Sequence, residues 1–271
     1  MSQQQDSSTK KTALITGASS GIGLELSKLF AKDGYDLVLV SRNKQKLARA
    51  ANTLRRGFGA RAWIIAKDLS KNRAAEEIYA QLRGKRARID VLVNNAGFGA
   101  YGFFSETDLK SQIGMIQVNI TSLTTLTRLI LKDMMRNGEG MILNVSSTAA
   151  FQPGPLMAVY YATKAYILSF SQALSNEVKG SGVSVSVLCP GPTETGFQAA
   201  AGIEQIRLVH GPIPGMMNAA QVAQLGYERL MKGKTVSIPG VMNKVGVLAN
   251  RFMPRALSTQ VVRILHAGPE G

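Results

Sequence analysis

Cysteine, histidine and acidic side chains are scarce in this sequence of 271 residues. The single cysteine, Cys189, excludes an internal disulfide framework and favours a reducing compartment. The two histidines stand in no spacing typical of a metal site, so we expect no resident metal. No stretch is both long and apolar enough to span a bilayer, and residues 1–11 lack the apolar core of a secretory signal. We therefore expect a cytoplasmic protein with a disordered lead-in at 1–11.

Acidic residues number 17 against 32 lysines and arginines, which gives a formal net charge of +15. Such an excess suits nucleic acid, an anionic membrane surface or a phosphorylated cofactor as partner. The densest basic run, residues 83–88, has no interleaved aromatic side chains and lies between a predicted helix and a predicted strand. A solvated basic surface explains this run better than a nucleic-acid site, because no nucleic-acid motif accompanies it.

Two hydrophobic patterns alternate along the chain. Short apolar runs predict strands at 12–16, 36–40, 62–66, 89–93, 141–145, 183–188 and 235–238. Helical periodicity predicts helices at 22–31, 43–56, 70–83, 106–136, 157–179 and 218–231, the third with Ser70 as its N-cap. Apolar strands that alternate with helices form parallel sheets covered on both faces. We predict a single α/β domain over 12–271, a doubly wound Rossmann fold with a parallel sheet of about seven strands, ordered 3-2-1-4-5-6 plus an edge strand.

A glycine-rich loop joins the first predicted strand to the first predicted helix. Its pattern, Gly17-x-x-x-Gly21-x-Gly23, stands where a dinucleotide pyrophosphate binds in such folds. Glycines let the backbone approach the phosphates, and the following helix offers free N–H groups and the positive end of its dipole. The predicted contacts to the cofactor in this loop are Gly17, Ser19, Ser20, Gly21, Ile22 and Gly23.

The end of the second strand bears on which dinucleotide binds. An acidic residue there bonds the ribose 2′-OH of NAD, whereas a basic residue nearby accommodates the 2′-phosphate of NADP. Here Ser41 stands in place of the acid and Arg42 follows it, and an arginine can bind phosphate bidentately. Ser19 and Asn43 could add hydrogen bonds. The sequence therefore predicts NADP(H) as cofactor, with a plain surface charge as the alternative reading of Arg42.

One tyrosine has the neighbour that carbonyl chemistry requires. Reduction of a carbonyl needs a hydride and a proton donor, and a tyrosine suits that role best if its pKa falls from about 10 toward neutrality. Tyr160 and Lys164 stand at i and i+4 of a predicted helix, so we expect the lysine cation to lower the tyrosine pKa. The corresponding partner of Tyr161 is Ala165, so Tyr161 does not meet the same criterion.

Taken in order, these motifs resemble the short-chain dehydrogenase/reductase family over residues 12–238. The resemblance implies catalytic roles for Ser147, which holds the substrate carbonyl, and for Asn119, which anchors a proton-relay water, with Ser146 as the fallback serine. It also implies cofactor contacts at Asp68, Leu69, Asn95, Ala96, Gly97, Tyr160, Lys164, Pro190, Gly191, Thr193 and Thr195, besides Arg42 and Asn43. Within the family, the likeness is greatest to bacterial oxidoreductases of the DltE type, and more distant to ketoacyl and hydroxysteroid reductases.

Residues 190–217 are predicted to form a lid over the substrate. Apolar side chains are frequent there and near the expected mouth of the pocket, and an apolar pocket favours a hydrophobic small-molecule substrate. Packing within the lid itself is the alternative. The residues concerned are Phe197, Ile203, Ile206, Leu208, Val209, Ile213, Met216 and Met217 on the lid, and Phe98, Tyr101, Phe103, Phe104 and Phe151 at the mouth.

The C-terminal extension, residues 240–271, mixes apolar residues with Lys244, Arg251, Arg255 and Arg263. A basic amphipathic helix can lie on an anionic membrane, but we favour packing onto the domain or onto a second subunit. The family resemblance implies a homodimer or homotetramer paired through the two long helices.

Together these features predict an NADP(H)-dependent oxidoreductase that interconverts a carbonyl and an alcohol. A non-catalytic NADP(H)-binding sensor on the same fold is the first alternative, and it is less favoured because Asn119, Ser147, Tyr160 and Lys164 are all present. A protein that binds nucleic acid or a membrane surface through its net charge is the second.

Overall fold

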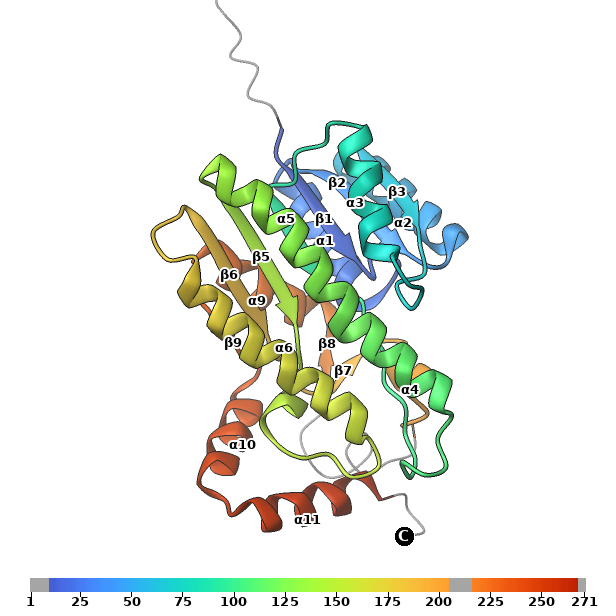
Figure 1. Cartoon of the computed structure of the whole chain (residues 1–271), viewed down its shortest axis with the longest axis vertical. Helices are drawn as coiled ribbons and strands as arrows, with labels where there is room; N and C mark the ends of the chain where they lie inside the picture. The colour runs from blue at the N-terminus through green and yellow to red at the C-terminus, as the bar shows by residue number, and fades with distance from the viewer. Residues whose placement is uncertain (1–9, 205–215, 268–271) are drawn as a thin grey trace, which may run out of the picture.

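The computed structural model describes residues 10–204 and 216–267 (Figure 1). Its strands are β1 (Thr12–Thr16), β2 (Asp36–Ser41), β3 (Ala62–Ala66), β4 (Val91–Asn94), β5 (Gly140–Val145), β6 (Val183–Leu188), β7 (Thr193–Glu194), β8 (Met217–Asn218) and β9 (Val236–Ser237). Its helices are α1 (Gly21–Lys32), α2 (Lys44–Phe58), α3 (Ala74–Gly84), α4 (Leu109–Ile116), α5 (Leu123–Asn137), α6 (Ala158–Glu177), α7 (Phe197–Ala201), α9 (Ala219–Met231), α10 (Val241–Phe252) and α11 (Arg255–His266). A π-helical segment, η1 (Gln117–Ser122), joins α4 to α5, and a 3₁₀ turn, η2 (Thr148–Phe151), follows β5.

The main sheet confirms the predicted topology. Within the described residues it has seven strands in the order β3-β2-β1-β4-β5-β6-β9, and every pair is parallel. The order reverses beside β1, so the loop after β1 and the loop after β4 meet at the carboxyl edge of the sheet. Such a switch point is where doubly wound folds bind their ligands.

Helices cover both faces of this sheet. On one face, Leu26 and Phe30 of α1 pack with Leu47 of α2 and Val222 of α9 in one hydrophobic core. On the other, Ile78 of α3, Ile130 of α5 and Leu174 of α6 form a second core. Figure 1 shows α3, α5 and α6 in front of the strands. The central strands are buried on both sides, which explains their continuous apolar sequences.

Local signals mark several helix ends. The side chain of Asn43 caps α2 by accepting a hydrogen bond from the Lys46 N–H at 2.9 Å, and Gly59 ends that helix in the left-handed conformation with φ 63°. Ser70 is not the N-cap that we predicted for α3. That position belongs to Arg73, with φ 59°, because Ser70 instead donates its hydroxyl to Asp68 Oδ1 at 2.8 Å.

The predicted helix over 106–136 also differs from the structure. It begins at Leu109 and is interrupted by the π-helical segment η1, which contains Asn119. Short π-helical segments occur mostly within α-helices and frequently at functional sites. The sequence periodicity does not reveal this segment.

After β6 the chain forms the short strands β7 and β8 and the helix α7. Of the predicted lid, Ile206, Leu208, Val209 and Ile213 lie outside the described residues. Beyond β9, α10 and α11 lie beside the carboxyl edge of the sheet, at the lower end of Figure 1. In the described segments 10–204 and 216–267, none of the helices combines the length and the apolar character needed to cross a membrane.

Candidate active site

The loop from β1 to α1 forms a backbone cradle. Gly17 and Gly21 adopt φ 67° and 54°, a region that glycine enters without strain. The Ser20 side chain makes no capping hydrogen bond, which leaves the first N–H groups of α1 without a side-chain acceptor. A Cβ on Gly21 would lie 3.1 Å from the Thr195 side chain, so this loop faces the segment after β6 across a narrow space. The cradle fits a pyrophosphate group.

The residues predicted to bind the adenosine end meet after β2 and β3. The hydroxyls of Ser19 and Ser41 are hydrogen-bonded at 3.0 Å, and Arg42 and Asn43 follow in an exposed position. Burial alone would raise the pKa of the Asp68 carboxyl, but hydrogen bonds from Ser70 and the charges of Lys71 and Arg42 lower it. Arg42 therefore lies close to the loop that carries Asp68.

The segment Asn94-Asn95-Ala96-Gly97, at the end of β4, supports the glycine-rich loop between β1 and α1, which we call the phosphate loop. Asn95 Nδ2 donates to the carbonyl oxygens of Thr16 and Gly17 at 2.9 and 3.3 Å. The Thr16 hydroxyl accepts from the backbone N–H groups of Asn95 and Ala96, each at 3.0 Å. The structure thus assigns Asn95 a bracing contact between β1 and β4. Thr16 belongs to the same brace, although the sequence reading gave it no role.

Tyr160 and Ser147 come together at the carboxyl edge of the sheet. Tyr160 lies in the first turn of α6 with 9% of its surface exposed, and Ser147 follows β5 at the start of η2. Burial raises the pKa of Tyr160 to about 12, and a hydrogen bond from the Ser147 side chain opposes that rise. Ser147 Oγ also lies 3.3 Å from Pro190 O.

Burial raises the pKa of Tyr160, and Lys164 does not bring that pKa toward neutrality as we predicted. Lys164 Nζ donates to Val145 O at 3.0 Å and lies 5.6 Å from the centre of the Tyr160 ring, and burial has the largest effect on the Tyr160 pKa. Burial also lowers the pKa of Lys164 itself, to about 8, which leaves the ammonium mostly charged at neutral pH. The neighbouring Cys189 is fully buried and its pKa is raised to about 12, which argues against a nucleophilic role.

Asn119 is fully buried beside Lys164. Its amide accepts from Phe98 N–H at 3.3 Å and donates to Phe98 O at 3.1 Å and to the Thr163 hydroxyl at 3.0 Å. A Cβ on Gly97 would lie 3.1 Å from Asn119 Oδ1 and 3.4 Å from Lys164 Nζ. The π-helical turn thus places Asn119, Gly97 and Lys164 around one small space.

Two further polar residues, Ser146 and Asn144, hold α6 in place. The hydroxyl of Ser146, our fallback serine, donates to Lys164 O at 2.8 Å, so Ser146 holds α6 while Ser147 contacts Tyr160. Asn144 lies between Asn94, from which it accepts at 2.9 Å, and the Ser171 hydroxyl, to which it donates at 2.9 Å. These hydrogen bonds connect β4 and β5 to α6.

The segment after β6 closes the cluster. The Thr193 hydroxyl donates to Gly191 O at 2.9 Å, and the Thr195 hydroxyl accepts from Phe197 N–H at 3.1 Å. Pro190 O accepts from Thr148 N–H at 2.8 Å, which joins this segment to the Ser147 turn. Thr195 therefore lies between the phosphate loop and α7.

The surroundings of Tyr160 are apolar. It packs in a cluster with buried Met115, Met157, Ala201, Ile203 and Val262, to which Phe98, Tyr101 and Phe197 add partly buried side chains. Three of the residues predicted for the mouth do not join it. Phe103 and Phe104 are exposed by 50% and 65%, and Phe151 packs instead beside Leu123 and Ile167.

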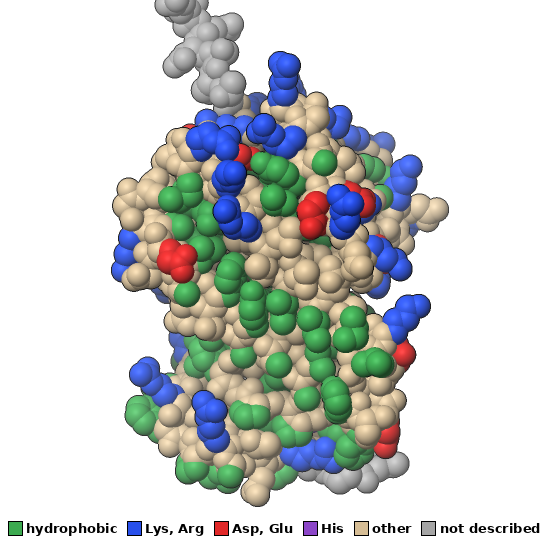
Figure 2. Space-filling model, in the orientation of Figure 1, with side chains coloured by type: hydrophobic (Ala, Val, Ile, Leu, Met, Phe, Trp, Pro, Cys, Tyr) green, Lys and Arg blue, Asp and Glu red, His purple; other side chains and the backbone are tan. Residues whose placement is uncertain are grey.

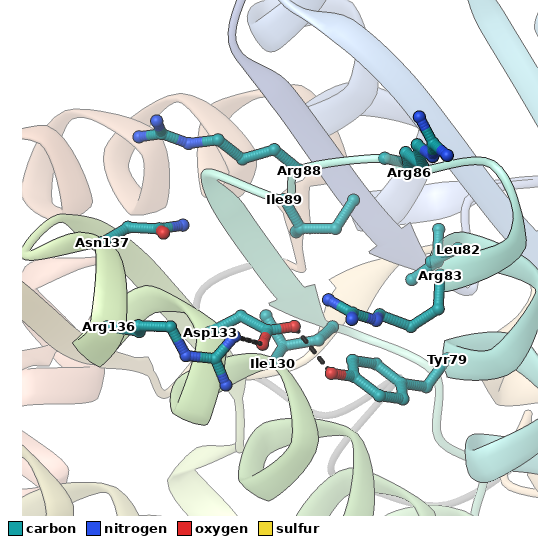
Figure 3. Close-up of a pocket in the computed structure, with 11 residues that line it drawn as sticks. Tyr79, Leu82, Arg83, Arg86, Arg88, Ile89, Ile130, Asp133, Arg136 and Asn137 are labelled. Atoms are coloured by element: carbon teal, nitrogen blue, oxygen red, sulfur yellow. Dashed lines mark hydrogen bonds and ion pairs between the residues drawn. The ribbon is translucent and has the colours of Figure 1, made fainter.

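A separate cavity of about 530 Å³ lies between the ends of α3 and α5 (Figure 3). It contains Arg83, Arg86 and Arg88 from the basic run, together with Tyr79 and Asp133. The Tyr79 hydroxyl donates to Asp133 at 2.7 Å, and Arg88 pairs with Asp90 at 2.8 Å and with Glu139. This cavity contains none of the predicted site residues. The basic run lies where we predicted, at the junction of a helix and a strand: α3 ends at Gly84, residues 85 and 86 form a turn, and β4 begins at Val91.

Comparison with known proteins gives a consistent result. The sequence profile for short chain dehydrogenases matches residues 11–205. The ketoacyl reductase HetN of Nostoc sp. is 32% identical over 231 residues, which cover 85% of this chain and 78% of HetN. The 17-beta-hydroxysteroid dehydrogenase type 3 of Mus musculus is 39% identical over 181 residues, but the chain spans only 58% of that protein's length.

Solved structures show the same likeness. A short-chain dehydrogenase from Sphingobium yanoikuyae in complex with NADPH superposes with a TM-score of 0.79 at 32% identity, over 89% of this chain and 93% of that one. A short chain dehydrogenase/reductase from Burkholderia phymatum in complex with NAD gives 0.78 at 26% identity, over 88% and 92%. Relatives with either dinucleotide are therefore similar in fold. None of these proteins tests the DltE-type likeness, which stays a prediction.

Proposed function

We propose that this chain, which belongs to the short-chain dehydrogenase family and is an oxidoreductase of carbonyl and alcohol groups, uses NADP(H) with Tyr160 as its general acid and base. The observation that carries the proposal is the convergence of Tyr160, Ser147 and Lys164 where the carboxyl ends of β4 and β5 meet α6. NADPH, when bound, supplies the hydride.

The residues at the carboxyl edge of the sheet suit such a cofactor from end to end. The glycine cradle and the uncapped start of α1 would hold the pyrophosphate. Arg42 and Ser41 favour a 2′-phosphate because no carboxylate stands at the end of β2 to repel it. Lys164 and Thr195 would hold the nicotinamide end, and Gly97 leaves the space beside Lys164 and Asn119 free of a side chain.

Each polar side chain then has a defined task. Tyr160 is protonated at neutral pH, and the protonated phenol is the form that gives its proton to a forming alkoxide. Ser147 donates a hydrogen bond at the same place and would hold the carbonyl oxygen. Lys164 brings positive charge beside Tyr160, and Asn119 fixes the turn that contains Gly97.

The apolar side chains around Tyr160 favour a hydrophobic carbonyl compound as substrate. Among the described residues, Met157, Phe197 and Ile203 bring apolar side chains to this cluster, which suits an apolar substrate better than a sugar. Names of relatives such as ketoacyl reductase and hydroxysteroid dehydrogenase agree with this class. A homodimer or homotetramer, paired through α5 and α6, remains our expectation for the assembly.

The test is turnover of ketones, aldehydes and 3-ketoacyl thioesters with NADPH or NADH. Tyr160→Phe is expected to lower kcat by roughly 10²–10⁴-fold, as for loss of a general acid, while the Kd for NADPH stays unchanged. Tyr166→Phe, on the same helix, is the matched control, since its hydroxyl bonds only Thr124 at 2.9 Å and stands outside the cluster. Equal losses in both variants would contradict the assignment of Tyr160.

The cofactor assignment has its own variant. Arg42→Ala is expected to weaken NADPH binding by about tenfold or more and to leave NADH binding unchanged, because it removes a charge-assisted contact to the 2′-phosphate alone. A wild-type preference for NADH would overturn the NADP(H) proposal. Tight NADPH binding without turnover of any carbonyl compound would favour the non-catalytic sensor.

A further inference from the structure

The helix α10 turns its apolar stripe outward. None of its residues is buried, and Val241, Val245, Leu248 and Phe252 follow one another at i, i+4, i+7 and i+11. Their exposures are 74%, 53%, 58% and 80%. The less exposed side of the helix contains Asn243 and Asn250, whose amides donate to Pro239 O at 2.7 Å and to Phe151 O at 2.6 Å. Polar contacts hold α10 to the domain, and its apolar face is left without a partner within the described residues.

The helix α11 repeats this arrangement with a buried side. Ser258, Val262 and His266 face inward, and Val262 joins the apolar cluster that contains Tyr160. The opposite side exposes Leu257, Val261 and Ile264, again at i, i+4 and i+7, by 48%, 38% and 57%. The exposed stripe of α11 therefore lies on the side of that helix opposite the candidate active site.

The exposed apolar surface continues onto the loop before α4. Phe103 and Phe104 in that loop are exposed by 50% and 65%. The Arg263 guanidinium of α11 lies 4.9 Å from the centre of the Phe103 ring, which joins loop and helix into one surface. We call the outer stripes of α10 and α11 together with Phe103 and Phe104 the C-terminal face.

The charged side chains of α10 and α11 are all basic. Lys244, Arg251, Arg255 and Arg263 are all exposed, and residues 229–267 contain no aspartate or glutamate. Figure 2 shows green and blue side chains at the lower end of the molecule, where Figure 1 places these helices. Apolar stripes flanked by basic residues fit a surface that offers acyl chains beneath anionic groups.

We propose that the C-terminal face docks on an anionic lipid bilayer, with the apolar stripes in the boundary between headgroups and acyl chains. A second copy of the chain fits the face less well. A two-fold contact through α10 and α11 would bring the four basic residues of one copy against the same four of the other, and like charges brought together repel. The proposal concerns binding and does not depend on the reaction assigned to Tyr160.

The test measures binding of the full chain to vesicles, by sedimentation. The protein is expected to bind vesicles of phosphatidylcholine with about 30% phosphatidylserine, and to bind vesicles of phosphatidylcholine alone much more weakly. Raising the ionic strength from about 0.1 M to about 1 M is expected to release most of the bound protein. Binding to neither vesicle overturns the proposal.

Paired variants separate the face from overall charge. The double variant L248E/F252E is expected to lower the partition coefficient by about tenfold or more, because it removes two apolar anchors and adds two negative charges. The control F58E/M231E makes the same change at residues exposed by 41% and 44% at the ends of α2 and α9, and it is expected to bind far better than L248E/F252E. R251Q and R255Q are each expected to weaken binding by about fivefold.

Light scattering and thermal melting of the same variants test whether a second copy of the chain, and not a bilayer, covers the C-terminal face. All are expected to keep the wild-type molar mass and melting temperature, since the substituted side chains are exposed. If L248E/F252E instead dissociates an oligomer, or if F58E/M231E loses vesicle binding to the same degree, the face is not a membrane-docking surface.

Discussion

The helices α1 and α10 have the same length of 12 residues and opposite surroundings. The first buries Leu26 and Phe30 against the sheet and presents its N-terminus to the phosphate loop. The second buries nothing, and asparagine amides attach it to the rest of the chain. Both sequences are amphipathic. An apolar stripe in a sequence thus indicates which side of a helix is apolar, but what covers that side depends on the rest of the molecule.

The largest expected contrast between the two helices concerns stability. Leu26→Ala is expected to lower the free energy of unfolding by about 2–5 kcal/mol, because it opens a cavity in a closed core. Leu248→Ala is expected to change it by less than about 0.5 kcal/mol, because that side chain is already 58% exposed. Urea unfolding of both variants makes the comparison, and similar losses would show that α10 packs more tightly than described.

A second contrast uses one glycine from each helix. A Cβ on Gly23 would meet Asn95 Nδ2 and the backbone oxygen of Gly17, and the backbone of that loop cannot move without losing its shape. Gly23→Ala is therefore expected to weaken NADPH binding by about tenfold to 100-fold.

Gly246 in α10 has open space around it, so Gly246→Ala is expected to raise the free energy of unfolding by up to about 1 kcal/mol. It is also expected to leave NADPH binding unchanged. Fluorescence titration of both glycine variants supplies the measurement. Unaltered binding in Gly23→Ala would remove the cradle from the proposed site.

A further prediction concerns the hydrogen bonds that join the end of α11 to α6 and to the loop before it. His266, the last residue of α11, is hydrogen-bonded through Nε2 to the Tyr161 hydroxyl at 2.8 Å and through Nδ1 to Pro155 O at 2.7 Å. The Tyr101 hydroxyl donates to its backbone oxygen at 2.7 Å. His266→Ala is expected to lower the free energy of unfolding by about 1–3 kcal/mol, because it leaves buried polar groups unpaired.

The same histidine gives the stability a pH dependence. Burial, and to a lesser degree the charge of Arg263, lowers the His266 pKa below its ordinary 6.5, although the bond to Pro155 opposes this. The unfolded chain therefore binds a proton more readily than the folded chain. The stability that neutral His266 contributes is complete above pH 6.5 and is lost as the pH falls toward the folded pKa. Melting temperatures from pH 8 to pH 5 are expected to fall less steeply in His266→Gln than in the wild type.

Much of the fold could be predicted because its signals are local. Strands β1, β3 and β6 have the predicted bounds, and the strand order follows from regular alternation with helices. The spacing of Tyr160 and Lys164 on one helix could be read in the same way. Ser147 was chosen over Ser146 by family spacing, and the contact with Tyr160 supports that choice.

What the sequence did not predict depends on contacts between distant segments. The Tyr160 pKa follows from how deeply α6 is buried, and the Lys164 ammonium is drawn to Val145 O on β5. Ser70 is a good N-cap by type, but Asp68 competes for its hydroxyl. Phe103 and Phe151 are apolar near the right place in the chain, and only tertiary packing decides that neither joins the cluster around Tyr160.

The π-helical segment η1 makes this part of the chain intolerant of changes in length. It holds one residue more per turn than an α-helix does. Deleting a single residue there would let α4 and α5 fuse into one continuous helix, and everything before the deletion would rotate by roughly 100° relative to α5. Asn119 and the apolar side of α4 would then no longer face Phe98 and α6 together. Insertions and deletions in natural variants of this chain are therefore expected to fall outside residues 117–122.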